Sequence, residues 1–181
     1  WSSDVCSSDL MHFDYHCGLG PGDVHLNLLP LFHVGGLFMA TSSFHAGAMN
    51  VNMSKFDATR AVELIEEKRV TFMFDFSPIL SSVLDEAEKT GGDISSLRAV
   101  VGLEAPATIE RYQESVGGTF FVMYGQTETS CVATFGRYDD CPGSAGRMLP
   151  AARVSLLDDR DRAVGVGEIG EIAVRGPMVF K

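Results

Sequence analysis

The segment at residues 123–130, MYGQTETS, places polar and flat side chains directly after an apolar run. Tyr124 offers a ring face on which a base can stack, worth about 1–3 kcal/mol where such stacking has been measured, and Gly125 lets a bound group approach the backbone. Thr127 offers a hydroxyl and an N–H to a phosphate oxygen, and Glu128 offers the hard carboxylate oxygen that Mg²⁺ prefers. These groups suit a nucleotide, although a tight turn with Thr127 as a helix cap and Glu128 as a solvated charge would also explain them.

Two further segments carry similar side chains. Residues 102–106, GLEAP, follow another apolar run, and His33 lies within PLFHVGG at residues 30–36. His33 can stand beside a reacting group, or it can be a histidine whose hydrogen bonds are satisfied at a strand–helix junction. The sequence alone leaves both interpretations open.

Strand and helix patterns alternate through most of the chain and must position these segments. Apolar, β-rich runs lie at residues 23–31, 49–53, 70–76, 97–102 and 119–124, and helical patterns lie at 34–46, 58–69, 78–89 and 106–116. This order predicts an α/β fold, a parallel sheet with helices on both faces. Ligands of open parallel sheets gather beyond the carboxyl ends of the strands, which is where GLEAP and MYGQTETS begin.

Residues that begin and end helices lie at the borders of these patterns. Asp57 can accept hydrogen bonds from the free N–H groups of the helix that follows it. Pro78 and Pro106 suit a first helical turn, where a missing N–H is harmless. Gly47 and Gly91 can end helices in the left-handed conformation.

The two ends of the chain differ from its middle. Residues 1–10, WSSDVCSSDL, are rich in Ser and Asp without periodicity, and we expect them to be a non-native tail. Residues 11–142 form the α/β part. From residue 143 to 181 the sequence alternates and is rich in turns, which predicts the start of a small β-rich subdomain that stops without a closing element. We therefore expect a fragment that lacks N- and C-terminal parts of its own protein.

Composition limits the classes of partner. The chain has 181 residues and a formal net charge of −10, which argues against nucleic acid, because phosphate backbones select the opposite sign. No apolar run approaches the roughly 20 residues of a transmembrane helix, so we expect no transmembrane segment. The four cysteines form no CxxC pair, which favours reduced thiols in a cytoplasmic protein.

Two other groupings carry weaker signals. His12, His16, Cys17 and His25 could suggest zinc, yet histidines four residues apart also arise by chance. Cys131 follows a serine, but no base is spaced to activate a nucleophile. A packed cysteine is the simpler interpretation.

Five segments occur in one order and together resemble the ANL adenylate-forming superfamily of acyl-CoA synthetases, peptide-synthetase adenylation domains and luciferases. They are PLFHVGG at 30–36, GLEAP at 102–106, YGQTE at 124–128, GSAGRMLP at 143–150 and GEIGEIAVRG at 167–176. The resemblance covers about residues 18–181 and implies part of the large N-terminal, AMP-binding domain. It implies a ligase of fatty acid metabolism that uses ATP and Mg²⁺, forms an acyl-adenylate from a small-molecule carboxylic acid, and transfers the acyl group to coenzyme A.

The resemblance also assigns roles to residues. The nucleotide-binding set would be Gly102, Leu103, Glu104, Tyr124, Gly125, Gln126 and Thr127. Thr127 would hold the α-phosphate, Glu128 the Mg²⁺, and His33 would stand beside the reacting carboxylate. Leu103 departs from the small residue common at its position, which puts close packing against adenine in doubt. Met148 replaces a common proline.

An acyl pocket is expected beside these residues. Its lining would come from residues 34–40, 72–76, 102–104 and 125–132, and the apolar Val34, Leu37, Phe74 and Phe76 suit an acyl or aryl group. These four side chains are also ordinary core residues.

Alternatives to this function stay open. The phosphate loop, the ribose-binding aspartate and the catalytic lysine of the superfamily are not in this sequence, so we expect the isolated chain to be inactive. A non-catalytic nucleotide-binding module is one alternative, and motif matches by coincidence are another. A peptide-synthetase adenylation domain is a third, although Val34 stands where those domains usually have an aspartate.

Overall fold

A seven-stranded sheet forms the centre of the molecule in the computed structural model, which describes residues 3–179. Its strand order is β2-β1-β3-β4-β5-β6-β7, and β1 to β5 are parallel. These five strands are β1 Val24–Asn27, β2 Met49–Asn52, β3 Phe72–Phe76, β4 Ala99–Leu103 and β5 Thr119–Tyr124. The predicted parallel sheet is therefore confirmed.

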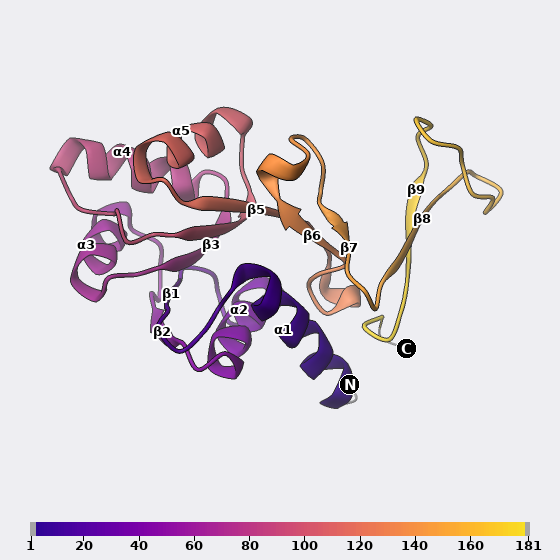
Figure 1. The fold of residues 1–181 in the computed structure, drawn as a ribbon, viewed down its shortest axis with the longest axis horizontal. Helices are drawn as coiled ribbons and strands as arrows, with labels where there is room; N and C mark the ends of the chain where they lie inside the picture. The colour runs from indigo at the N-terminus through magenta and orange to yellow at the C-terminus, as the bar shows by residue number, and fades with distance from the viewer. Residues whose placement is uncertain (1–2, 180–181) are drawn as a thin grey trace.

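Helices cover both faces of the sheet (Figure 1). They are α1 Ser3–Cys17, α2 Val34–His45, α3 Ala58–Lys68, α4 Ile79–Thr90 and α5 Pro106–Val116. α3, α4 and α5 pack on one face in a cluster that contains Met73, and α1 and α2 pack on the other with Phe72 and Phe74. Successive β3 side chains thus enter opposite cores, as strand alternation requires.

Several helix boundaries are as expected. Asp57 Oδ1 accepts a hydrogen bond from Arg60 N–H at 2.8 Å, and Pro106 is the first residue of α5. Gly91 ends α4 in the left-handed conformation. At the start of α4, however, Pro78 is the cap residue and offers no side-chain hydrogen bond. Asp75 Oδ1 instead accepts from Leu80 N–H at 2.9 Å, a contact that the sequence did not reveal.

The strand expected at residues 23–31 is shorter than predicted. β1 ends at Asn27, whose Oδ1 accepts from Leu29 N–H at 3.3 Å. This local hydrogen bond takes the backbone out of the ladder, and the chain turns before Pro30. The apolar side chain of Leu28 is buried outside the strand.

The terminal regions add three features. Residues 3–10 are the first turns of α1, although no helix was predicted there, and Trp1 lies outside the described residues. After residue 124 the sheet continues with antiparallel β6, Thr134–Arg137, and β7, Arg147–Met148, neither of which was predicted. The sheet thus extends past residue 143. The expected β-rich unit is the antiparallel pair β8, Arg153–Leu157, and β9, Glu171–Arg175, and two 3-10 turns, η1 Thr127–Thr129 and η2 Tyr138–Asp140, complete the elements.

No helix among residues 3–179 combines the length and the apolar character needed to span a lipid bilayer.

A partly buried ion pair fastens the amino ends of the strands. Arg98 donates from Nε and Nη2 to the two carboxylate oxygens of Asp23 at 2.8 and 2.7 Å, and also to the carbonyl oxygens of Cys17 and Gly18. Burial alone would raise the pKa of Asp23, but hydrogen bonds from Arg98 and Thr71 outweigh it and lower that pKa below its usual value. The pair ties α1 to the sheet.

Replacing Arg98 with alanine is expected to lower the free energy of unfolding by about 2–3 kcal/mol, because a mostly buried carboxylate loses its cationic partner and two carbonyls lose their hydrogen bonds from Arg98. Urea unfolding measures this change. Arg69→Ala is the matched control, since the Arg69–Asp93 pair is exposed and its loss should cost below about 1 kcal/mol. Equal losses in the two variants would contradict the structural role of Arg98.

Candidate functional site

The carboxyl ends of β4 and β5 lie side by side. Val101 pairs with Phe121 and Gly102 with Val122, so the residues that follow both strands emerge at one edge of the sheet. β3 ends at the same edge, where Phe76 pairs with Leu103. The topology therefore brings GLEAP and MYGQTETS to neighbouring positions.

A tight turn follows β5, and Thr129 rather than Thr127 stabilises it. Thr129 Oγ1 accepts from Gln126 N–H at 3.1 Å, and Cys131 N–H donates to the carbonyl of Gln126 at 3.1 Å. The side chains of Thr127 and Glu128 are exposed, and neither forms a hydrogen bond within residues 3–179. The turn therefore leaves both groups available to a ligand.

Gly125 lets this turn pack directly on the backbone that follows it. A Cβ atom at Gly125 would lie 1.5 Å from the carbonyl oxygen of Cys131 and 3.0 Å from the Cα of Val132. Ala133 N–H donates to the carbonyl of Tyr124 at 2.8 Å and closes the loop. Only glycine allows this approach.

His33 forms the N-cap of α2. Its Nδ1 accepts from Gly35 N–H at 3.1 Å, and its ring meets Phe76 edge-on with centroids 6.4 Å apart. An imidazole that accepts at Nδ1 has its N–H at Nε2, and this nitrogen of the exposed His33 forms no hydrogen bond with residues 3–179. His33 is thus satisfied at a strand–helix junction through Nδ1.

These groups converge on one cavity of about 270 Å³. Its lining residues come from the start of α2, the end of β3 and the turn after β5: His33, Val34, Gly35, Phe74, Phe76, Met123, Gly125, Gln126, Thr127, Glu128 and Cys131. Five of the sequence-predicted site residues, His33 and residues 125–128, are therefore brought together. Glu128 is the one acidic side chain among the lining residues.

The other four predicted site residues lie at the same sheet edge but do not line this cavity. Tyr124 and Glu104 are half-buried, and Leu103 is exposed. Glu104 Oε1 accepts from Ala105 N–H at 2.8 Å, whereas its Oε2 is buried without a partner in the described chain. Gly102 has φ +156°, and a Cβ there would lie 1.9 Å from the carbonyl oxygen of Asp75.

The apolar lining is partly as expected. Val34, Phe74 and Phe76 contact the cavity, as predicted, but Leu37 does not. Its side chain is 53% exposed. Cys131 lies within the expected range 125–132, whereas Met123 was not anticipated, since nothing in an apolar strand position signals contact with a cavity.

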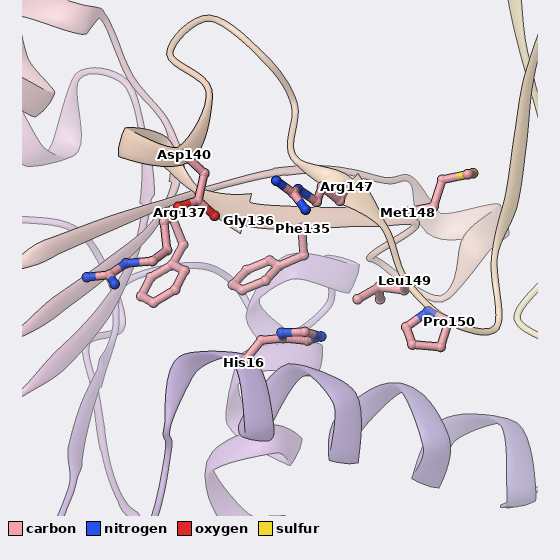
Figure 2. A pocket seen from close by; sticks show the side chains of 10 residues that line it. His16, Phe135, Gly136, Arg137, Asp140, Arg147, Met148, Leu149 and Pro150 are labelled. Atoms are coloured by element: carbon pink, nitrogen blue, oxygen red, sulfur yellow. The ribbon is translucent and has the colours of Figure 1, made fainter.

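A larger cavity of about 500 Å³ lies elsewhere, between the end of α1 and the β6–β7 hairpin (Figure 2). Phe121 and Phe135 stack there with centroids 5.2 Å apart, and the ring of His16 lies below Phe135 in Figure 2, with centroids 6.2 Å apart. Arg137 and Arg147 also contribute to its lining. None of the predicted site residues lines this cavity, so the smaller cavity is the candidate site.

The histidines and cysteines considered for zinc do not form one group. The described residues contain no cluster of three or more His, Cys, Asp or Glu that could hold a metal ion. His25 lies within β1, where its Nδ1 is 2.9 Å from Asn50 Oδ1, and burial lowers its pKa to about 4. Burial also raises the pKa of Cys17, which disfavours the thiolate form that a zinc ligand requires.

Asp75 is a buried residue near the carboxyl end of β3. Burial raises its pKa to about 7, the charge of Glu104 adds to this, and the hydrogen bond from Leu80 N–H only partly offsets it. Because the folded pKa exceeds that of the unfolded chain, the folded state binds the proton more tightly. Its contribution to stability is complete below the unfolded value and is lost as the pH rises through about 7.

Asp75→Asn is expected to gain stability relative to the original chain as the pH rises from about 4 to 7.5, since the amide keeps the acceptor for Leu80 N–H without the charge. Urea unfolding at pH 4.5 and 7.5 measures the difference. Comparing the two chains cancels His25, whose lowered pKa gives the opposite trend. A difference in stability that is the same at both pH values would contradict a shifted Asp75.

The chain matches known proteins over nearly its whole length. The family model described as "AMP-binding enzyme" matches residues 3–181. Indoleacetate–CoA ligase of Aromatoleum aromaticum is 35% identical over 168 residues, which are 90% of this chain and 33% of that protein. The chain thus spans about a third of the length of this curated relative.

Solved structures share the fold. A structure from Rhodopseudomonas palustris, assigned as a long-chain-fatty-acid CoA ligase, has a TM-score of 0.92 at 42% identity and covers 98% of this chain and 45% of its own. O-succinylbenzoate coenzyme A synthetase from Bacillus subtilis, solved with ATP and a magnesium ion, has a TM-score of 0.84 at 27% identity. This match covers 98% of the present chain and 38% of the synthetase.

Proposed function

The chain belongs to the AMP-binding enzyme family, and from this premise we propose that it is the AMP-binding part of an acid–thiol ligase. The complete protein would activate a carboxylic acid with ATP and pass the acyl group to coenzyme A. The observation that carries the proposal is the single cavity shared by His33, Thr127 and Glu128. Thr127 and Glu128 present exposed polar groups without hydrogen bonds to residues 3–179.

The reaction would run in two steps. A carboxylate oxygen of the acid attacks the α-phosphorus of ATP, and the bond from that phosphorus to the oxygen bridging to the β-phosphate breaks. Pyrophosphate departs, and the product is an acyl-adenylate. The thiolate sulfur of coenzyme A then attacks the acyl carbon, and AMP leaves. Charge builds on phosphate oxygens in the first step, so positioned donors such as the hydroxyl and N–H of Thr127 would stabilise its transition state.

Glu128 is the residue of this chain that suits Mg²⁺. Its carboxylate is exposed at the cavity beside Thr127. Because residues 3–179 hold no larger group of metal-binding side chains, the ion would keep phosphate oxygens and waters as most of its ligands, as Mg²⁺ commonly does. Bound there, Mg²⁺ would neutralise charge on the phosphates.

The remaining predicted residues would position the two substrates. Tyr124 would stack on the adenine, with Gly102–Glu104 along its other side, and Gln126 would border the nucleotide. His33 would donate from Nε2 to the carboxylate of the acid, since its Nδ1 is already occupied by Gly35 N–H. Gly125 would form part of the acyl wall.

Pyrophosphate release by the complete protein, measured with a panel of short, long and aromatic acids, tests the proposal. Release that requires an acid, ATP and Mg²⁺ together supports it. Binding of Mg-ATP without release for any acid would instead support a non-catalytic nucleotide-binding module. An amino acid as the one active substrate would favour a peptide-synthetase adenylation domain.

A further inference from the structure

The cavity beside His33 ends against packed core. Among its lining side chains Phe74 is 1% exposed, Cys131 3% and Met123 8%. They belong to the same buried cluster as Met39 and Val132, which solvent does not reach. An acyl chain longer than the cavity would have to displace core side chains, which cannot relax cheaply at native packing density.

The backbone is also closely packed at two positions beside the cavity, Gly35 and Gly125. A Cβ atom at Gly35 would lie 3.3 Å from His33 Nδ1, 3.3 Å from Leu29 Cδ1 and 3.5 Å from Phe74 Cε1, so the start of α2 packs closely against β3 at this position. On the opposite side the backbone at Gly125 rests on the carbonyl of Cys131. A long acyl chain that passed through either position would have to separate these packed groups.

The size and shape of the remaining space favour a compact group. About 270 Å³ lies just below the roughly 300–1,000 Å³ of pockets for drug-sized ligands. The rings of Phe74 and Phe76 lie 5.4 Å apart at 66°, an edge-to-face arrangement that can extend to a third ring. An aryl group would gain this contact.

The charges around the cavity exclude a second carboxylate. The lining that this chain supplies contains no Lys or Arg, and its ionisable side chains are His33, Glu128 and Cys131. An anionic group deep in the cavity would be desolvated without a cationic partner. The carboxylate that reacts can instead remain at His33.

We propose that this site takes a compact monocarboxylate, an aryl or short alkyl acid, and that Phe74 sets the length limit. The inference rests on the proposed function, because it assumes that the cavity holds the acyl group. It predicts that the complete protein has a kcat/KM for phenylacetate at least tenfold above the value for dodecanoate, and that succinate is a poor substrate.

Pyrophosphate release with phenylacetate, hexanoate, dodecanoate and succinate tests the length limit. Phe74→Leu is expected to raise the dodecanoate-to-phenylacetate ratio of kcat/KM at least tenfold. It shortens the end wall with less risk to folding than Phe74→Ala, and circular dichroism checks the fold. Phe72→Leu is the matched control, because Phe72 is buried on the same face of β3 but does not line the cavity.

The outcomes separate the two proposals. Dodecanoate used as well as phenylacetate by the original protein, or an equal change of the ratio in Phe72→Leu, would overturn the length limit alone. No pyrophosphate with any acid would overturn the proposed function, and the length limit with it. A raised ratio in Phe74→Leu with an unchanged ratio in Phe72→Leu supports both.

Discussion

Glu128→Gln is expected to lower acid-dependent pyrophosphate release by about 10²-fold or more. The amide has the shape of the carboxylate but loses the charge that suits Mg²⁺, and removal of one group that stabilises transition-state charge, such as an oxyanion-hole donor, costs about 10²–10³ in rate. Because the Glu128 side chain is exposed and forms no hydrogen bond with the rest of residues 3–179, the fold should be unaffected.

The Mg²⁺ dependence of the rate identifies the cause. In Glu128→Gln the concentration of Mg²⁺ needed for half-maximal release should rise, whereas an exposed control, Glu114→Gln, should leave both the rate and the Mg²⁺ requirement unchanged. A Glu128→Gln rate within threefold of the original would remove Glu128 from the proposed site.

Gly125→Ala should have the second large effect. The new methyl group would lie 1.5 Å from the carbonyl oxygen of Cys131, so the backbone of residues 125–131 has to move. Thr127 and Glu128 move with it, and displacements of about 1 Å from reactive geometry can cost 10²-fold in rate. We expect at least this loss of pyrophosphate release.

The free energy of unfolding should also fall in this variant, by about 1–3 kcal/mol, the usual cost of overpacking. Gly22→Ala is the control, since a Cβ at Gly22 has no atom within 4 Å and its φ is not positive. A Gly125→Ala protein with full activity would mean that the loop of residues 125–131 does not determine the position of the reacting groups.

Local patterns predicted most of the parallel sheet, because the residue pattern of each strand and helix is contained in a few neighbouring residues. Asp57 caps α3 as expected, since an N-cap depends on four consecutive positions. Asp75 takes the capping position at α4 from five residues away in the chain. Such a contact depends on how β3 meets the helix, and a sequence pattern does not contain it.

The candidate site shows the same division. The types and order of residues 124–128 indicated polar contacts beyond β5, but the sequence could not decide between a ligand site and a capped turn. The structure assigns the turn's hydrogen bonds to Thr129. Which apolar residues face the cavity depends on packing between segments that are distant in the sequence. Phe74 lines the cavity and Leu37 does not, although both are apolar residues in the expected ranges.

The chain leaves the core before the β8–β9 hairpin and returns to it afterwards at nearly the same place. Gly176 comes so close to the backbone where the excursion begins that a Cβ on it would lie 2.6 Å from the carbonyl oxygen of Ala151. Just beyond, Met178 is buried and its carbonyl accepts from Ser130 Oγ at 3.0 Å. For a loop with both ends held, doubling the length costs only about 0.6 kcal/mol of closure entropy. We therefore expect this chain to tolerate a longer or shorter hairpin while the turn above the cavity keeps its geometry.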